Sequence, residues 1–227
     1  MNPKLLVATR NPGKMRELRI LFSDLPVAVL TLDEAGMNEE TAETGDTYAA
    51  NALLKANAAY QATGLLSLGD DSGLEVDALG GRPGLYSARY GEGTLTWPER
   101  RAKLLGELEG VPEEKRTARF RCAIALCAPG QPPTTLEGVC EGRIAFAPAG
   151  SGGFGYDPIF YLPDYGCTMA ELDEEAKNQI SHRGRAAQKA KAVLMEWLGL
   201  TPPLAPPATV PPQSPPHSHA PPTTRPA

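Results

Sequence analysis

One stretch, LLSLGDDSGLEVDALGGRPGLYSARYG, spans residues 65–91 and guides the interpretation of the whole chain. A short apolar run typical of a buried strand leads into two adjacent carboxylates, Asp70 and Asp71, and then into a glycine-rich segment. We expect the strand to end at this pair. Adjacent carboxylates repel each other, so two negative charges at this place require an explanation.

The chain has the composition of an ordinary globular protein, with 227 residues of which 41% are hydrophobic and 22% charged. Its N-terminal apolar run is too short for a signal peptide, and no later window is apolar enough to cross a membrane. A net charge of -5 argues against nucleic-acid binding, which needs a basic face. Its four cysteines form no CxxC pair and are expected to be reduced and chemically silent. We predict a cytoplasmic protein that binds neither membranes nor nucleic acids.

A change in composition after Leu200 divides the chain into two parts. Residues 1–200 have the patterns of a folded domain, whereas residues 201–227 are rich in proline and nearly devoid of large apolar side chains. Such a segment cannot bury enough apolar surface to offset its ordering entropy, so we predict a disordered tail. His217 and His219 lie in this tail and are not expected to bind a metal.

Strand and helix patterns alternate in the first half of the domain, and strands dominate later. Besides the run that ends at the Asp pair, strands are expected at residues 4–9, 27–32, 117–129, 134–148 and 157–163. Helices are expected at residues 11–25, 46–64, 96–110 and 181–198. This order predicts an α/β fold with a mixed, twisted β-sheet flanked by helices.

The segment TRNPGK, residues 9–14, joins the first strand to the first helix. A hydroxyl, an amide, a lysine and the free N–H groups of a helix N-terminus together can bind phosphate. The segment is not a Walker A loop, because Ala8 replaces the first glycine and Met15 replaces the final Ser or Thr. On its own it is better explained as an Asn cap beside a surface lysine.

Carboxylates upstream of the Asp pair suggest a metal. Glu43 precedes a helix that carries Asn51 and Lys55 four residues apart, hence on one face. An acidic, solvated loop is the simpler explanation of Glu43 alone. Together with Asp71, however, it offers the oxygen ligands that Mg²⁺ prefers, beside a possible phosphate site.

Two later motifs carry groups suited to a ligand. GSGGFGYDPIF, residues 150–160, combines flexible glycines with aromatic rings and a carboxylate, although a turn with core aromatics explains it equally well. KNQISHRGRAAQKAK, residues 177–191, places cations just before and at the start of a helix, where the helix dipole disfavours them. The second motif therefore predicts a bound anion or carbonyl.

Taken together, these motifs closely resemble the inosine/xanthosine triphosphate pyrophosphatase (Ham1-like) family of house-cleaning enzymes. The resemblance covers roughly residues 4–198 and is carried by TRNPGK, ETGDTYAANALLKA, DDSGLEVDALGGRPGLYSARY, GGFGYDPIF and ISHRG in the family's order and spacing. Arg10 occupies a position where the family usually has a small residue. The resemblance implies a single elongated, two-lobed domain with an active-site cleft.

Residue roles follow from this resemblance. It implies that Asp71 is the general base and a Mg²⁺ ligand, and that Glu43 is a second metal ligand with Asp70 nearby. The residues implied in substrate binding are Thr9, Arg10, Asn11, Pro12, Gly13, Lys14, Ser72, Phe154, Gly155, Tyr156, Asp157, Lys177, His182 and Arg183. Phe154 would stack on the purine, while the first motif and Ser72 would hold the triphosphate.

The activity implied is Mg²⁺-dependent hydrolysis of ITP, dITP and XTP to the nucleoside monophosphate and pyrophosphate, by a homodimer. Donors aimed at a 6-keto oxygen would be left unmatched by the amino group of adenine, which explains discrimination against ATP. Two alternatives stay open: a pyrophosphatase for other modified nucleotides, and a module that binds a nucleotide without cutting it.

Overall fold

The computed structural model describes residues 2–39, 41–91 and 94–200, and the predicted tail at residues 201–227 lies outside them. The described strands are β1 (Lys4–Ala8), β2 (Ala28–Leu30), β3 (Leu66–Val76), β4 (Thr117–Cys127), β5 (Thr134–Ile144), β6 (Phe160–Leu162) and β7 (Cys167–Thr168). The α-helices are α1 (Pro12–Leu21), α2 (Tyr48–Thr63), α3 (Trp97–Glu107), α4 (Glu174–Ile180) and α5 (His182–Trp197). In the described part of the chain, no helix has the length and apolar character needed to span a membrane.

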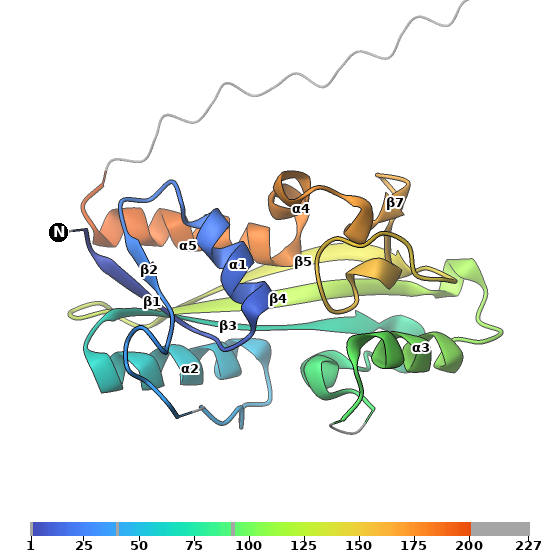
Figure 1. The fold of residues 1–227 in the computed structure, drawn as a ribbon, viewed down its shortest axis with the longest axis horizontal. Coiled ribbons are helices and arrows are strands. Elements are labelled where there is room, and N and C mark those ends of the chain that lie inside the picture. The colour runs from blue at the N-terminus through green and yellow to red at the C-terminus, as the bar shows by residue number, and fades with distance from the viewer. Residues whose placement is uncertain (1, 40, 92–93, 201–227) are drawn as a thin grey trace, which may run out of the picture.

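The described strands form one seven-stranded sheet in the order β2-β1-β3-β4-β5-β6-β7. Strand β1 runs parallel to both β2 and β3, whereas every later neighbour pairs antiparallel. Helices α1 and α5 cover one face of the sheet and α2 and α3 lie on the other (Figure 1). The prediction of a mixed sheet flanked by helices is confirmed.

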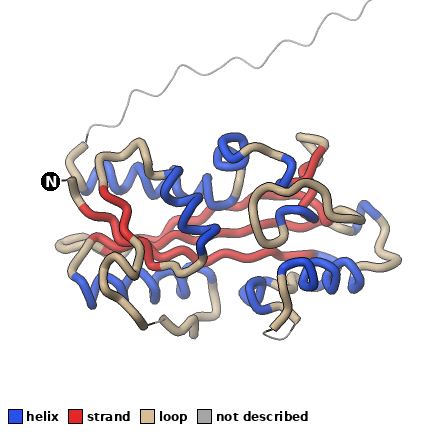
Figure 2. Tube along the Cα trace, viewed as in Figure 1, coloured by secondary structure: helices blue, strands red, loops and turns tan. Residues whose placement is uncertain are grey.

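The molecule is elongated along its three longest strands, β3, β4 and β5, which carry helices at both ends (Figure 2). Separate apolar cores form at the two ends. One is built around Leu5, Leu18 and Leu194, and the other around Leu74 and Phe160. The long strands therefore join two lobes, each with its own packed interior.

Helix α1 begins as its sequence predicts. The Asn11 side chain accepts a hydrogen bond of 3.1 Å from the backbone N–H of Lys14, and Pro12 occupies the first turn. The predicted inner face, formed by Met15, Leu18, Leu21 and Phe22, is buried. This packing fixes the helix N-terminus, with Lys14 in its first turn, just beyond the end of β1.

The Asp pair lies inside a strand, so the prediction that the strand ends there is wrong. Asp70 pairs with Ile124 and Asp71 with Ala123 in an antiparallel ladder that continues to the end of β3. Only the parallel partner stops, because β1 ends where its Ala8 pairs with Gly69. At the Asp pair, β3 therefore has a strand neighbour, β4, on one edge only.

Other boundaries differ from prediction for local reasons. The expected strand at residues 157–163 begins only at Phe160, because Asp157–Ile159 forms a 3-10 turn around a proline. The expected strand at residues 27–32 shrinks to β2, and helix α4 was not predicted. In α2, the helix backbone lies so close to the sheet that its fully buried positions are small or polar: Asn51, Ala52, Ala56 and Ala59.

The contact between α2 and the sheet depends on Gly69. A Cβ atom at this position would overlap the backbone carbonyl oxygen of Ala52, which cannot move without shifting the helix. We expect Gly69→Ala to lower the free energy of unfolding by about 1–3 kcal/mol, the usual cost of overpacking. Gly106→Ala is the matched control, because a Cβ there meets nothing within 4 Å and should leave the stability equal or slightly higher. Urea denaturation of both variants measures this, and equal midpoints for the two would contradict the packing argument.

Candidate active site

A cavity of about 720 Å³ opens beside the Asp pair. It brings together most of the predicted site residues, namely Thr9, Arg10, Asn11, Lys14, Glu43, Asp71, Ser72, Phe154, Gly155, Tyr156, Asp157, Lys177, His182 and Arg183. Pro12 and Gly13 are not among its lining residues. They form the first turn of α1, where Gly13 leaves room for the Phe154 ring, whose Cδ1 would lie 2.7 Å from an added Cβ.

Asp70 is fully buried and fully paired. Its carboxylate binds Arg183 Nε at 2.8 Å and Lys14 Nζ at 2.5 Å, and it accepts a contact from the Cys122 thiol at 3.3 Å. Burial alone would raise the pKa of this carboxyl group, but Arg183 and Lys14 hold its pKa well below the usual range. Asp70 is thus a permanently ionised structural group, and it holds Lys14 at the cavity.

Asp71 lies beside it in a different environment. Its carboxylate accepts a hydrogen bond of 3.1 Å from the Asn51 side chain and lies 3.5 Å from Lys55 Nζ. Burial raises the pKa of Asp71 above its ordinary value, with Glu43 adding to the effect and Lys55 opposing it. Because Asp71 lines the cavity and is weakly paired, it is the member of the pair suited to accepting a proton.

Glu43 approaches Asp71 from the loop that precedes α2. Lys55 Nζ contacts Glu43 at 2.6 Å and Asp71 at 3.5 Å, so one ammonium already lies between the two carboxylates. These oxygen ligands come from separate elements and suit a hard divalent cation. The described residues contain no group of three or more acidic, His or Cys side chains placed to hold a metal. Two carboxylates are nevertheless typical of a Mg²⁺ site in which substrate phosphates and water supply the remaining ligands of the ion.

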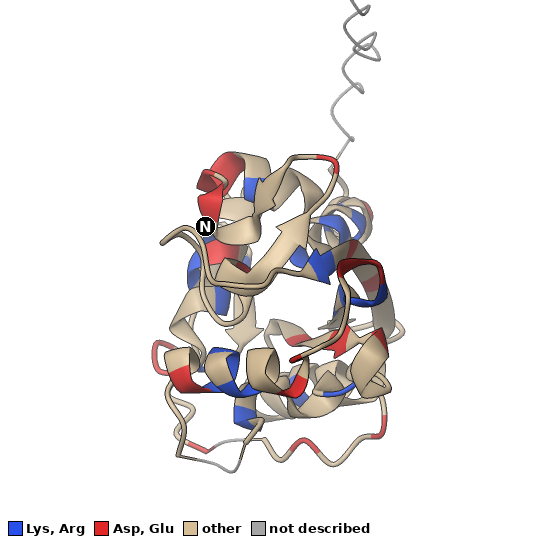
Figure 3. Ribbon diagram, turned by 90° about the vertical axis from the view of Figure 1, so that its right-hand side faces the viewer, with Lys and Arg blue, Asp and Glu red and all other residues tan. Residues whose placement is uncertain are grey.

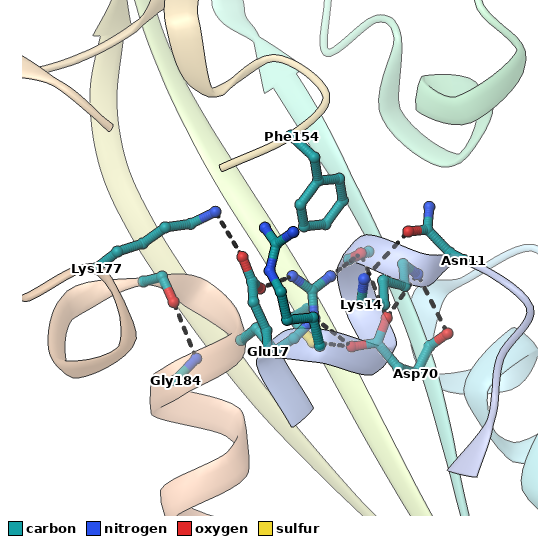
Figure 4. A network of polar contacts seen from close by, with 12 residues as sticks. Asn11, Lys14, Glu17, Asp70, Phe154, Lys177 and Gly184 are labelled. Carbon is teal, nitrogen blue, oxygen red and sulfur yellow. Dashed lines mark hydrogen bonds and ion pairs between the residues drawn. The ribbon is translucent and has the colours of Figure 1, made fainter. Parts of the chain in front are cut away.

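Phe154 lines the cavity, and its ring packs beside Gly13 in the first turn of α1. The Lys177 ammonium and the Arg183 guanidinium lie 5.1 and 5.5 Å from the centroid of its ring. Figure 4 shows Phe154 and Lys177 in the same polar network as Glu17. The Phe154 N–H donates to the Asp157 carboxylate at 2.8 Å, which fixes the glycine-rich turn. One face of the ring is therefore held against the protein while the residue lines the cavity.

Lys177 and Arg183 are bound to carboxylates of the protein itself. Lys177 Nζ contacts Asp157 at 2.5 Å and Glu17 at 2.6 Å, and Arg183 Nη1 contacts Glu17 at 2.6 Å. The remaining Arg183 nitrogens bond Asp70 and Ser72. The anion predicted near these cations is thus supplied, in the structure, by Glu17, Asp70 and Asp157. Direct contact of Arg183 with a purine stays a prediction.

His182 faces the cavity as a neutral ring. Its imidazole stacks on Phe120 at a centroid distance of 4.6 Å, and within the described residues its Nδ1 atom has no hydrogen-bond partner. Burial lowers the pKa of His182 well below its usual value, and the nearby Arg183 lowers it further. The ring can therefore donate a hydrogen bond to a ligand, or accept one from it, while it stays uncharged.

The Arg10 guanidinium is used in contacts within the protein, which argues against a role in phosphate binding. It binds the Asp33 carboxylate and the Met37 carbonyl oxygen, each at 2.8 Å. It thereby ties the turn after β1 to the loop that follows β2. This pairing gives a local reason for an arginine where the resembling family usually has a small residue.

Three functional candidates were not predicted from the sequence. Glu17 is only 2% exposed and links Lys177 with Arg183, while Arg89 and Trp97 line the cavity from the lobe that contains α3. A glutamate within a helix resembles a solvent-facing residue, so its pattern gave no indication of burial. Arg89 lies in the quoted stretch and could have been singled out as a cation close to the Asp pair.

Comparison with known proteins agrees with the geometry. Residues 5–193 match the model of the Ham1 family. The chain belongs to the Ham1 family. A relative from Geobacillus kaustophilus named dITP/XTP pyrophosphatase is 53% identical over 186 residues, which are 82% of this chain and 91% of the relative. A second one of that name, from Geobacter sulfurreducens, is 52% identical over 86% of this chain and 96% of its own length.

Solved structures place the fold in the same family. A HAM1 protein from Coxiella burnetii matches with a TM-score of 0.77 and 42% identity, over 86% of this chain and 99% of that protein. The Ham1 fold therefore extends over nearly all of the described residues. The cavity beside the Asp pair is the part of this Ham1 chain that carries its charged and aromatic motifs.

Neutralising the two adjacent carboxylates should change the stability of the protein by very different amounts. The folded-state pKa of Asp70 is lowered, so its ionised form stabilises the protein above the unfolded-state pKa of about 3.9, and this contribution is lost as the pH falls through the folded-state value. The folded-state pKa of Asp71 is raised, so its ionised form opposes folding at neutral pH. Asp70→Asn should therefore lower the free energy of unfolding at pH 7 by about 3–5 kcal/mol, the cost of breaking a buried pair.

Asp71→Asn serves as the matched control, and its unfolding free energy should stay within about 1 kcal/mol of the unmodified protein. Denaturant titrations at pH 7 measure both values. A loss for Asp71→Asn equal to that for Asp70→Asn would contradict the division of roles.

Proposed function

We propose that this Ham1 family protein hydrolyses nucleoside triphosphates of deaminated purines, ITP, dITP and XTP, to the nucleoside monophosphate and pyrophosphate. The family membership and the dITP/XTP pyrophosphatase names of its close relatives support the substrate class. The observation that carries the proposal is the environment of Asp71 in the cavity. Asp71 is a weakly paired carboxylate with a raised pKa, and the cavity also holds the N-terminus of α1, which can bind phosphate, and the Glu43–Lys55 ion pair.

The chain's own residues suggest how the triphosphate is held. The N-terminus of α1 offers backbone N–H groups and the Lys14 ammonium at the cavity, with Thr9 and Asn11 beside them. Asp70 fixes Lys14 in place, and Ser72 follows on the same strand. These groups favour an anion next to Asp71.

In the proposed reaction, water adds to phosphorus while Asp71 takes its proton, and the bond between the α-phosphate and the bridging oxygen breaks. Pyrophosphate then leaves with that oxygen. The raised pKa of Asp71 favours this role, because a general base is most effective when its pKa approaches the working pH. Asn51 orients the carboxylate by donating to its Oδ2 atom at 3.1 Å.

Mg²⁺ dependence is part of the proposal. Glu43 and Asp71 would hold the ion, since both already contact one cation, Lys55 Nζ. When bound, the ion neutralises phosphate charge and lowers the pKa of a coordinated water. Without the ion, Lys55 holds the two carboxylates together.

The base would lie beside Phe154. The ring provides a stacking face, and the unpaired Nδ1 atom of the neutral His182 provides a polar contact that could read the purine edge. Lys177 and Arg183, which lie against the Phe154 ring, are held in place because both donate hydrogen bonds to Glu17. We also propose a cytoplasmic homodimer, which sedimentation velocity of the purified protein would test.

The most direct test of the activity is a substrate panel. Purified protein is incubated with ITP, XTP, GTP and ATP in the presence and absence of Mg²⁺, and the products are identified by ion-exchange chromatography. We expect pyrophosphate and the monophosphate from ITP and XTP only with Mg²⁺, and far slower turnover of ATP. Release of inorganic phosphate with a diphosphate would show cleavage of a different bond.

The same panel, extended to modified pyrimidine nucleoside triphosphates, separates the alternatives. Preference for modified pyrimidine nucleotides would favour the rival pyrophosphatase. Tight binding of ITP without turnover would favour a binding module.

Two conservative variants test the roles of the carboxylates. Asp71→Asn should lower kcat by at least about 100-fold, because an amide cannot accept the proton of water. Glu43→Gln should chiefly raise the Mg²⁺ concentration needed for half-maximal rate. Steady-state kinetics over a Mg²⁺ series measures both. Near-normal kcat for Asp71→Asn at saturating Mg²⁺ would rule out its role as the base.

A further inference from the structure

The basic side chains of the cavity differ in how far their donors are already used. Lys177 and Arg183 are 5% and 2% exposed and are held by buried carboxylates, and Lys14 is 13% exposed and bound to Asp70. Lys55 is shared between two carboxylates. These cations are largely neutralised by the protein, so a side chain with unused cationic donors would add to the binding of a triphosphate beyond the proposed Mg²⁺.

Arg89 has capacity to spare. It ends the 3-10 helix Gly84–Arg89 and lines the cavity, and its side chain is 50% exposed. Its one ion pair in the described part of the chain joins Nη1 to Glu43 Oε2 at 3.3 Å, and its guanidinium also lies 5.7 Å from the centroid of the Tyr86 ring. A guanidinium carries five N–H donors, so most of them stay available to a ligand.

The ion pairs also locate Arg89 along the cavity. Phe154 lies over Lys177 and Arg183, and Arg183 connects through Asp70 to Lys14. On the other side, Asp71 connects through Lys55 to Glu43, and Glu43 connects to Arg89. A nucleotide whose base stacks on Phe154 and whose scissile bond lies at Asp71 would therefore extend its terminal phosphates toward Arg89.

The Arg89–Glu43 pair can be exchanged at little cost. Ion pairs between partly exposed side chains are worth only about 0–1 kcal/mol, whereas an arginine binds phosphate through two parallel, charge-assisted hydrogen bonds. Glu43 keeps Lys55 as a partner at 2.6 Å when Arg89 leaves it. A phosphate group is thus a better partner for Arg89 than the carboxylate it contacts in the structure.

We propose that Arg89 binds the terminal phosphates of the substrate and, after hydrolysis, the pyrophosphate product. This inference rests on the proposed function and adds a phosphate-binding residue from the lobe opposite α1. It predicts that Arg89 contributes to the affinity for pyrophosphate and not to the affinity for the nucleoside monophosphate.

Isothermal titration calorimetry tests the inference without turnover. Pyrophosphate and IMP are titrated separately, at fixed Mg²⁺, into the full chain and into its Arg89→Ala variant. We expect Arg89→Ala to weaken pyrophosphate binding about tenfold or more, the effect of losing one charge-assisted contact, and to leave IMP binding unchanged. Unchanged IMP binding also shows that the variant is folded around the site. Arg89→Lys, which keeps the charge and loses the fork, should weaken pyrophosphate binding less.

Arg82→Ala is the matched control. Arg82 is 60% exposed and paired at 3.3 Å with a single carboxylate, that of Glu107, but it does not line the cavity. It should leave both affinities unchanged. Equal pyrophosphate affinity in Arg89→Ala and the unmodified chain would overturn the inference, as would equal weakening of pyrophosphate and IMP. Failure of the proposed function would instead appear as an unmodified chain that does not hydrolyse ITP, whatever the calorimetry shows.

Discussion

The Arg183 guanidinium lies at the junction of the elements that build the site. From the first turn of α5 it bonds Asp70 and Ser72 of β3 and Glu17 of α1, and its side chain is only 2% exposed. Removing such a charge from water is favourable only when every partner is in place. The position of α1, and with it the phosphate-binding turn, therefore depends on this one buried cation.

That constraint explains the adjacent carboxylates of β3. Neighbouring residues of a strand point to opposite faces, so Asp70 turns toward Arg183 and α1 while Asp71 turns toward Asn51 and Lys55 of α2. The first is neutralised permanently by the fold, and the second keeps a raised pKa. Two identical side chains, one residue apart, thus serve stability and chemistry separately.

Charge elsewhere follows a different pattern. Figure 3 views the molecule from the side that lies to the right in Figure 1 and shows Lys and Arg positions interspersed with Asp and Glu positions. Partly exposed ion pairs such as Arg119–Asp77 and Arg143–Glu113 mix the two signs in the same way. The expectation that the chain does not bind nucleic acid stays a prediction from its net charge of -5.

Local patterns predicted much of the fold because local physics decides those parts. The Asn11 cap, the apolar face of α1 and the alternating residues of β4 need no distant partner, and all three are present in the structure. The interior position of the Asp pair was missed because it depends on Arg183, 113 residues further along the chain. Without that partner, a buried aspartate in mid-strand is unfavourable.

The sequence predicted which residues form the site better than it predicted how they pair. Most of the predicted site residues line the cavity, because glycine turns and helix starts are visible in sequence. The motifs did not indicate that Lys177 and Arg183 are neutralised by Glu17, since a helical glutamate resembles a solvated one. Whether a cation is available to a ligand depends on long-range pairing, and only the structure shows it.

The central claim is that the fold separates the two carboxylates into a permanently ionised one and a reactive one. Carbon-13 NMR of the aspartate carboxyl carbons, followed over a pH series and assigned with the two Asn variants, tests this directly. The account predicts that Asp71 titrates above the ordinary value of about 3.9, whereas Asp70 stays ionised to the lowest pH at which the protein remains folded. Titration of Asp70 at or above the midpoint of Asp71 would contradict it.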